Sequence, residues 1–507
     1  MLARRLLLPL VFVAGMTSLA VEFGASRLLA PYFGTSLYVW GVLIGLILVY
    51  LSAGYVLGGR LADRYPRDDL LFTITAVAAL WIGLVPLAAY PILLLSQQGF
   101  ATLSAGLVLG TLLAVILLFA LPVILLGCVS PFAIRLLLRD VEHGGNTAGA
   151  VYALSTAGSI LGTFLPVFWF IPSYGTRPTL IGFSLVLLAI SVAGLWPRRR
   201  WLGALGVVVI AAGILLETVG IKPPAEGRLL YEKESAYNYI QVTQVGDENR
   251  LILNEGEAVH SIYDPGTLLT EGPWDDMLLA PFFSPAAPSS EQPLKVLIVG
   301  LAGGTAARQY RAAFPNADIT GVEIDPDIVS AGYRFFSLGS AHVDVVVQDG
   351  RYFLATDPTS YDVIVMDAYR QPYIPFHLMT REFFQLARDH LRPGGVVVVN
   401  AGRTAKDFRL VDAVASTMRP VFASVLLLDT TRFTNTLVYG TAEPASVGEV
   451  REHIAGSDSE LVHEVAVSAL PEGDLRLSPY HGQVYTDDLA PVERLIDSII
   501  LGYITGR

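Results

Sequence analysis

Four positions that could recognise a ligand follow short apolar runs in the C-terminal half of the chain. The run Val296–Val299 is followed by the glycine-rich stretch Gly300–Gly304. Three later apolar runs are each followed by a carboxylate, in the order Glu323, Asp349 and Asp367. Parallel strands joined by helices bring their carboxyl ends to one edge of a sheet, and ligands bind there. The four positions are therefore predicted to line one site.

Nucleoside recognition is the chemistry that these residue types favour. Glycines allow the backbone to approach a ligand closely. An acidic residue that ends the second strand, about twenty residues after the turn, accepts hydrogen bonds from ribose hydroxyls. The predicted cofactor-binding residues of this region are Gly300, Ala302, Gly304, Glu323, Asp349 and Gly350. The set predicts an adenosyl compound; the alternative is a Rossmann scaffold that binds no nucleotide.

Alternating strands and helices must position these residues. The predicted strands of a doubly wound parallel sheet are 296–299, 319–323, 343–347, 363–366 and 396–399. Before them, the alternating segments 239–242 and 250–253 flank the polar stretch 246–249 and predict a β-hairpin module.

The first half of the chain is suited to a different solvent. Of the 507 residues 53% are hydrophobic and 16% charged, and residues 1–220 carry a net charge of +5 against −16 for the rest. Apolar spans long enough to cross about 30 Å of hydrocarbon predict about seven membrane helices. They are expected near 6–25, 38–58, 70–95, 101–127, 147–171, 178–196 and 201–219.

Three parts of the chain follow from this division. They are a membrane domain over 1–221, a linker and β-hairpin module over 222–290, and a Rossmann-like domain over 291–507. The single cysteine, Cys128, lies in an apolar run, so no intrachain disulfide can form and no cysteine-rich metal site is expected. No metal is predicted at all.

Arginines alternate between the ends of the predicted spans. One side would carry Arg4, Arg5, Arg60, Arg64, Arg67, Arg135, Arg139 and Arg198–Arg200, the other only Arg27, Arg177 and Lys222. The positive-inside rule makes the arginine-rich side, including the loop 59–69, cytoplasmic. The catalytic domain is expected in the cytoplasm, beside the supply of adenosyl cofactors, of a multi-pass protein of the cell membrane. Seven crossings would instead place the catalytic domain outside the cell. This conflict disappears if the segment 201–219 lies in the membrane–water interface or if one span is miscounted.

Five sequence motifs resemble those of spermidine synthases, in order and at suitable spacing. They are Ser235–Val242, Leu253–Gly256, Val322–Asp325, Gln348–Gly350 and Tyr361–Asp367. The similarity covers about 228–440, and the whole chain resembles membrane-fused spermidine synthase-like proteins. The resemblance implies a fold of the spermidine synthase/methyltransferase type. It also implies that Glu323 holds the ribose, that Asp349 binds the adenine amino group, and that Asp367 lies near the sulfonium.

The chain departs from the family pattern where substrate should bind. Gly303 stands where the family has an aspartate that contacts the aminopropyl ammonium, and Arg370 replaces the aspartate that binds the attacking amine. Asn238 or His260 stands for the glutamine of the hairpin module. The Tyr-His/Gln-Glu segment appears as Trp274-Asp275-Asp276. Two acidic contacts for a cation are thus absent and one positive charge is added.

The leading interpretation is a membrane-anchored aminopropyltransferase that uses decarboxylated S-adenosylmethionine and an amine acceptor. Asp367, Tyr369 and Arg370 are the predicted catalytic residues. Asn238 joins the predicted cofactor contacts, and the predicted substrate contacts are His260, Trp274, Asp275, Asp276 and Asp487. Asp275, Asp276 or Asp487 could offset the charge of Arg370, although Asp487 is also placed to cap a helix after Pro491.

Two other functions remain open. One is an S-adenosylmethionine-dependent methyltransferase that acts on a lipid or another anionic acceptor; the other is a transporter or sensor that binds adenosyl compounds or polyamines without turnover. The expected partners are a small-molecule or lipid acceptor and the membrane, with a homodimer as one form of assembly. The acidic soluble half lacks basic-aromatic patches, so nucleic acid is not expected to bind.

Overall fold

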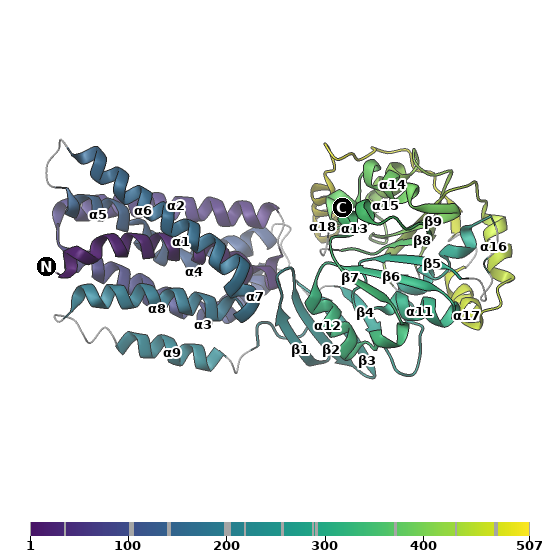
Figure 1. Ribbon diagram of the computed structural model, residues 1–507, viewed down its shortest axis with the longest axis horizontal. Helices are drawn as coiled ribbons and strands as arrows, with labels where there is room; N and C mark the ends of the chain where they lie inside the picture. The colour runs from purple at the N-terminus through teal and green to yellow at the C-terminus, as the bar shows by residue number, and fades with distance from the viewer. Residues whose placement is uncertain are drawn as a thin grey trace. The chain divides into compact units, whose positions relative to one another are not determined.

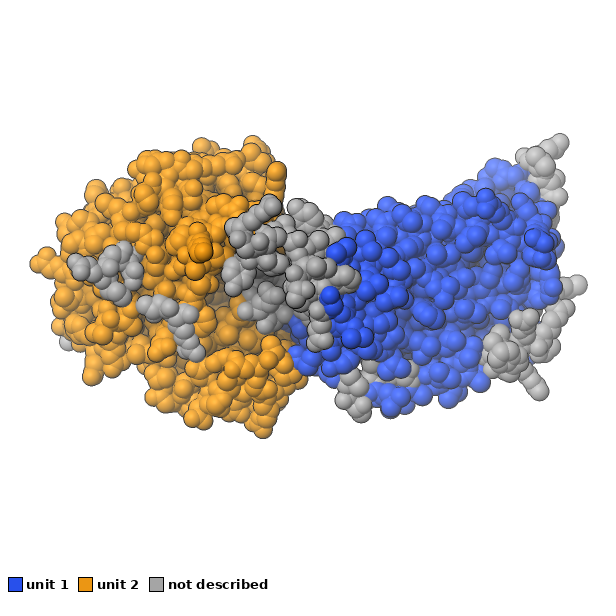
Figure 2. Space-filling model, turned by 180° about the vertical axis from the view of Figure 1, so that it is seen from behind, with its two compact units in different colours: residues 1–223, 232–239 blue, residues 224–231, 240–507 orange. Residues whose placement is uncertain are grey.

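Two compact units make up the chain (Figure 2). The computed structural model describes residues 2–34, 37–100, 106–138, 143–196, 204–216, 220–254, 258–285, 288, 293–369, 373–430, 433–470 and 475–505. The first unit comprises Met1–Pro223 and Glu232–Tyr239, and the second Pro224–Tyr231 and Ile240–Arg507.

The first unit is a bundle of long apolar helices that lie side by side (Figure 1). Its helices are α1 (Leu2–Phe33), α2 (Leu37–Arg64), α3 (Asp68–Phe100), α4 (Gly106–Gly127), α5 (Val129–Leu137), α6 (Gly144–Leu165), the π-helical η1 (Pro166–Phe170), α7 (Ile171–Tyr174), α8 (Thr176–Leu195) and α9 (Ala204–Leu216). Within the described residues, six helical stretches are long and apolar enough to cross a membrane. They coincide with the first six predicted spans, and the seventh prediction falls on the shorter α9.

Small residues let α1 and α6 approach closely. A β-carbon added at Gly158 would lie 2.0 Å from the carbonyl oxygen of Phe12, and one at Gly162 would lie 2.0 Å from that of Met16. By contrast, a β-carbon at Gly45 on α2 would meet nothing within 4 Å. Helix contacts in an apolar solvent depend on such close packing, because burial of apolar surface gives little driving force there.

The predicted hairpin is present and forms the centre of a small four-stranded sheet. Four strands form it in chain order: β1 (Arg228–Glu234), β2 (Tyr239–Val245), β3 (Glu248–Leu253) and β4 (Val259–Tyr263). Ile240, Val242 and Leu251 of this sheet share a core with Ile328 and Ala331. The last two residues lie on α12 (Pro326–Phe335), so the small sheet packs against a helix of the larger domain.

The larger domain is built on an eight-stranded sheet in the order β12-β10-β11-β9-β8-β5-β6-β7. Its strands are β5 (Lys295–Val299), β6 (Asp318–Glu323), β7 (Asp344–Val347), β8 (Tyr361–Met366), β9 (Leu391–Gly402), β10 (Ser424–Asp429), β11 (Asn435–Thr441) and β12 (Leu475–Leu477). The five predicted parallel strands are all present and adjacent, as β7-β6-β5-β8-β9. β11, β10 and β12 add an antiparallel edge, so the sheet is mixed.

Helices cover both faces of this sheet (Figure 1). They are α10 (Pro273–Met277), α11 (Thr305–Ala313), α12, α13 (Gly350–Thr356), α14 (Arg381–Asp389), α15 (Arg409–Met418), α16 (Val447–Ala455), α17 (Glu460–Ala469) and α18 (Val492–Thr505), with short 3-10 turns η3 (Ala280–Phe283), η4 (Leu338–Ala341) and η5 (Phe376–Leu378). Val296 and Ile298 of β5 belong to one hydrophobic core, with α11, α16 and α17. Leu297 and Val299 belong to the other, with α14, α15 and α18. This period of two confirms a central strand buried on both faces.

Candidate active site

The glycine-rich turn leads from β5 into α11 and runs against the end of β8. Gly300 has φ +89°, and a β-carbon there would lie 2.5 Å from the carbonyl oxygen of Asp367. Gly304 has φ +88°, and its β-carbon would lie 2.3 Å from a methyl group of Leu338. Both the backbone conformation and the contact require glycine at these positions. Ala302, between them, adopts φ +49° with a side chain in place.

Glu323 ends β6 and points back to this turn. One carboxylate oxygen accepts the Ala302 N–H at 2.9 Å, and the other accepts the Asp325 N–H at 3.1 Å. Burial raises the pKa of Glu323 to about 7, against the opposing effect of these hydrogen bonds. Each carboxylate oxygen has a second lone pair, which a ribose hydroxyl could use.

Asp349 follows β7 and caps α13. One oxygen accepts the Tyr352 N–H at 2.9 Å, as an N-cap residue does. The other lies 3.0 Å from Nε2 of His377, on η5. Gly350 begins α13 so close to β5 that a β-carbon would meet Val299 at 2.3 Å. The site edge formed by β5, β6 and β7 therefore carries the predicted residues together.

Asp367 follows β8 and is held from two sides. Trp274 Nε1 donates to one carboxylate oxygen at 2.9 Å, and Asn400 Nδ2 donates to the other at 2.8 Å. Asn435 Nδ2 in turn donates to the side-chain oxygen of Asn400 at 2.8 Å. Burial raises the pKa of Asp367 to about 6, although the bonds from Asn400 and Trp274 lower it in part. The carboxylate is oriented by uncharged donors.

Tyr369 lies next to this network and binds the backbone at the end of β9. Its hydroxyl donates to the Asn400 carbonyl at 2.8 Å and accepts the Gly402 N–H at 3.0 Å. Burial raises the pKa of the Tyr369 phenol, so it is a neutral hydrogen-bonding group. Arg370, the third predicted catalytic residue, lies outside the described residues.

The position of the absent ammonium-binding acid is filled by neighbouring side chains. A β-carbon at Gly303 would lie 2.9 Å from the β-carbon of Ser261 and 2.9 Å from the ring of Phe336. The Gly303 N–H donates to Ser261 Oγ at 2.8 Å. His260 precedes Ser261 on β4 and is half-buried. A side chain at position 303 would therefore overlap Ser261 and Phe336.

Asp275 and Asp487, two of the predicted substrate contacts, are engaged by protein groups. Asp275 is buried and accepts hydrogen bonds from Thr270 Oγ1 at 2.6 Å and Gln309 Nε2 at 2.5 Å, and burial raises its pKa. Asp487 accepts two bonds from Arg351 at 2.7 and 2.6 Å, which lower its pKa. The same arginine donates to the His377 carbonyl at 2.9 Å, so Asp487 belongs to the Asp349 side of the site.

Asp276 and Asn238 complete the predicted set. Asp276 is buried on α10, and its carbonyl oxygen accepts the Tyr439 hydroxyl at 2.7 Å. Asn238 is buried in a turn of the first unit, where its N–H donates to Ser235 Oγ at 2.8 Å. Cofactor contact by Asn238 and substrate contact by Asp276 stay predictions.

Sequence reasoning missed Asn400, His377 and Ser261. Asn400 directly follows the predicted strand 396–399, so the rule that selected Asp367 could have found it. His377 and Ser261 reach the site from η5 and β4 and carry no comparable signal. In the described part of the chain, no cluster of three or more His, Cys, Asp or Glu side chains is arranged for a metal.

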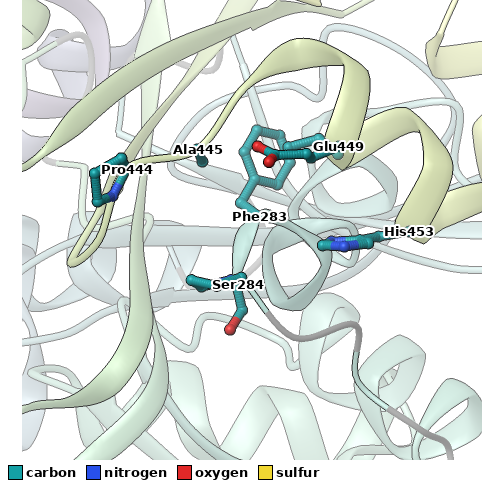
Figure 3. Close-up of a pocket in the computed structure, with 8 residues that line it drawn as sticks. Phe283, Ser284, Pro444, Ala445, Glu449 and His453 are labelled. Atoms are coloured by element: carbon teal, nitrogen blue, oxygen red, sulfur yellow. The ribbon is translucent and has the colours of Figure 1, made fainter.

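A pocket of about 80 Å³ lies elsewhere in the second unit (Figure 3). It is lined by Phe283, Ser284, Pro285, Pro444, Ala445, Glu449, Val450 and His453. Glu449 is already committed to capping α16 through Ser446, and His453 Nδ1 lies 3.2 Å from the Phe282 carbonyl. The pocket shares no residue with the predicted site.

The sheet order and the carboxylates at its carboxyl edge are those of a Rossmann-type α/β transferase domain. Residues 284–437 match the family described as spermine/spermidine synthase domain. A probable polyamine aminopropyl transferase of Bifidobacterium longum is 33% identical over 318 residues, which cover 58% of this chain and 70% of that protein. A polyamine aminopropyltransferase of Corynebacterium efficiens is 25% identical over 445 residues, covering 82% of this chain and 80% of the relative.

The chain belongs to the polyamine aminopropyltransferase, or spermidine synthase, family, and it is a transferase. This confirms the family predicted from the motifs. Among solved structures, spermidine synthase from Thermotoga maritima aligns with a TM-score of 0.39 and 20% identity, over 48% of this chain and 85% of that chain.

Proposed function

We propose that the protein transfers an aminopropyl group from decarboxylated S-adenosylmethionine to an amine acceptor while anchored in a membrane by its helical unit. The observation that carries this proposal is the half-buried Asp367 carboxylate, oriented by Trp274 and Asn400 at the end of β8. It stands beside the glycine-rich turn, on the same sheet edge as Glu323 and Asp349.

The donor would be held by its nucleoside part. Glu323 would accept hydrogen bonds from the ribose hydroxyls, and Asp349 would accept one from the adenine amino group. Both carboxylates are already oriented by backbone N–H groups, which lowers the cost of ordering them on binding. The donor's sulfonium carbon would then face Asp367.

The reaction is an in-line displacement. The acceptor nitrogen forms a bond to the carbon next to sulfur, the carbon–sulfur bond breaks, and its electron pair stays on sulfur to give methylthioadenosine. The proton released from the amine goes to Asp367 or to water. A carboxylate with a pKa of about 6 is mostly ionised at neutral pH and can accept that proton.

The packing at Gly303 favours one alternative donor. The tail of decarboxylated S-adenosylmethionine carries an unbalanced ammonium, whereas the tail of S-adenosylmethionine is zwitterionic. Ser261 and Phe336 fill the space that an acidic side chain at position 303 would need. No negative charge at this position therefore balances the ammonium of the decarboxylated donor. Methyl transfer from S-adenosylmethionine to a lipid or anionic acceptor is therefore the second candidate function.

The membrane, the acceptor and the assembly belong to the same proposal. Six long apolar helices support insertion in a membrane, and the family supports a polyamine acceptor. A homodimer is a further prediction, to be checked by light scattering of the purified full chain.

Product analysis tests the proposed reaction. The purified full chain is incubated with a mixture of amines and either donor, and sulfur products are identified by mass spectrometry. Methylthioadenosine formed only with the decarboxylated donor would support aminopropyl transfer. S-adenosylhomocysteine formed from S-adenosylmethionine would establish methyl transfer instead, and ligand binding with neither product would favour a transporter or sensor.

A further inference from the structure

The last helix of the first unit runs back along the bundle. A β-carbon at Gly206 would lie 3.8 Å from Leu188, and one at Gly213 would lie 3.1 Å from Ile181. Residue numbers therefore rise along α9 while they fall along the facing side of α8. The two helices are antiparallel neighbours, as Figure 1 also shows.

Hydrogen bonds place the residues after α9 at the end of the bundle where α8 begins. Arg177, at the start of α8, donates to the Gly220 carbonyl at 3.1 Å. Tyr32, at the end of α1, donates to the Ile221 carbonyl at 2.8 Å, and Lys222 Nζ donates to the Pro31 carbonyl at 2.7 Å. Residues 220–222 thus lie where α1 ends and α8 begins. α1 starts, and α8 ends, at the opposite end.

The opposite end carries most of the positive charge. Arg4 and Arg5 begin α1, Arg60 and Arg64 end α2, and Arg135 near the end of α5 pairs with Asp63 of α2 at 3.0 Å. In sequence, Arg139 follows α5 and Arg198–Arg200 follow α8, and both of these helices end on that side. Up to residue 222, ten arginines belong to this end in sequence, against three cations, Arg27, Arg177 and Lys222, at the end reached by residue 220.

The three cations at the second end are used as hydrogen-bond donors to the backbone. Arg177 and Lys222 bind the carbonyls named above, and Arg27 donates to the Ser235 carbonyl. The segment around Ser235 lies in the first unit and is also held by Glu234, which accepts the Thr176 N–H at 2.9 Å. The chain passes between the units three times, at 223–224, 231–232 and 239–240, and all three points adjoin the arginine-poor end of the helical unit.

From the helix directions and this charge distribution we infer that the catalytic domain lies on the extracytoplasmic side of the membrane. Arginine-rich ends stay in the cytoplasm, because translocating their charges is costly. Among the described residues after Pro223, no helix is long and apolar enough to cross again. The expectation of a cytoplasmic domain rested on cofactor supply alone, which the course of α9 outweighs.

Given the proposed function, a catalytic domain on the extracytoplasmic side needs its donor on that side of the membrane. A charged adenosyl sulfonium does not cross hydrocarbon unaided. A carrier-mediated step must then deliver the donor to the outer face before transfer, and the acceptor must be an amine or headgroup available there.

Thiol labelling of the full chain decides the side. In a Cys128→Ser background, Asp63→Cys reports on the arginine-rich end without removing a positive charge, and Val467→Cys reports on the catalytic domain. These positions are 76% and 85% exposed, so both can react once the reagent reaches them. Spheroplasts are treated with an impermeant maleimide, with and without permeabilisation.

We expect Val467→Cys to be labelled equally in both conditions and Asp63→Cys only after permeabilisation. Protection of Val467→Cys in intact spheroplasts, or labelling of Asp63→Cys there, would overturn the inference.

If a cysteine variant is poorly folded, protease treatment of spheroplasts that carry the tagged, otherwise unchanged chain replaces the labelling experiment. Loss of a C-terminal tag with an intact N-terminal tag is then expected, and a protected C-terminal tag would count against the inference. Neither readout depends on catalytic activity.

Discussion

Asp367 is half-buried and has uncharged hydrogen-bond partners. Trp274 and Asn400 each donate one hydrogen bond to it, and among the described residues no cation pairs with its carboxylate. A cationic sulfonium or ammonium in the site would supply the missing counter-charge. Individual carboxylates, rather than the fold alone, should therefore control donor binding and turnover.

Replacing Glu323 with glutamine should weaken binding of methylthioadenosine by about 1–3 kcal/mol, the range for a hydrogen bond to a charged group. Ribose hydroxyls favour the ionised carboxylate, so the affinity of the unmodified protein should rise as the pH passes through about 7, the pKa of Glu323. Calorimetric titration between acid and alkaline pH measures both effects. An unchanged dissociation constant in Glu323→Gln would remove the ribose assignment.

Replacing Asp367 with asparagine should lower kcat by about 10²–10⁴-fold, as expected for loss of a general base. In the unmodified protein, kcat/KM should rise as the pH increases through about 6, because the carboxylate must be ionised to accept a proton. The pH–rate profile of both forms is the measurement. Asn400→Ala, which removes a donor to Asp367, should shift the profile to higher pH; a profile identical to that of the unmodified protein would contradict this account.

Arg370 and Gly303 replace the two family acids that would recognise cationic substrates. Because a guanidinium repels an ammonium and pairs with a carboxylate or phosphate, putrescine should be a poor acceptor with the decarboxylated donor. Arg370→Asp should improve it. Robust spermidine formation by the unmodified chain that Arg370→Asp does not increase would refute the prediction, and would fit an arginine that turns to a surface acid.

At the scale of elements, a glycine is required only where a neighbouring backbone lies too close for a side chain. The two glycine pairs Gly41/Gly45 and Gly158/Gly162 have the same four-residue spacing, but only the second meets a neighbouring helix. The glycine-rich turn behaves in the same way, since Gly300 abuts the backbone of Asp367. Spacing alone cannot distinguish a packed glycine from an exposed one.

Gly158→Ala should destabilise the helical unit by about 1–3 kcal/mol, because the new methyl group would overlap the Phe12 carbonyl and separate α1 from α6. Gly45→Ala is the matched control. It meets nothing and should be neutral or slightly stabilising, since alanine favours helices over glycine by about 0.5–1 kcal/mol. Thermal unfolding in detergent compares the two. Equal melting temperatures would mean that α1 and α6 do not pack as described.

At the scale of the whole molecule, the helical unit and the α/β unit have separate hydrophobic cores. No core cluster joins the two sets among the described residues. A ligand of the α/β unit should then stabilise that unit and leave the helical unit unaffected.

Methylthioadenosine at 100 times its dissociation constant should stabilise the α/β unit by about 2.7 kcal/mol through linkage. Calorimetric unfolding of the full chain in detergent should show one transition that moves up with ligand and one that does not. Glu323→Gln at the same ligand concentration should show a smaller shift. Equal shifts of both transitions would indicate that the two units unfold together.

The sequence by itself determined the family, the fold class and the positions of the parallel strands along the chain. Each buried strand is recognisable as an apolar run. The residue that follows the run must lie at the carboxyl end of the strand, so the positions of Gly300, Glu323, Asp349 and Asp367 could be predicted. Six of the expected helical spans could be found for the same reason, since length and hydropathy are local properties.

The tertiary structure alone decided which side chains meet at those positions. Trp274 and Asn400 reach Asp367 from segments 93 and 33 residues away, and Ser261 reaches Gly303 across 42 residues. Asp275 accepts hydrogen bonds from Thr270 and Gln309, contacts that the sequence did not predict, and its contact with substrate stays a prediction. The antiparallel edge of the sheet was missed as well, because strand pairing depends on which edges are free once the parallel strands have associated. Such contacts arise only when distant segments pack, so no local pattern in the sequence specifies them.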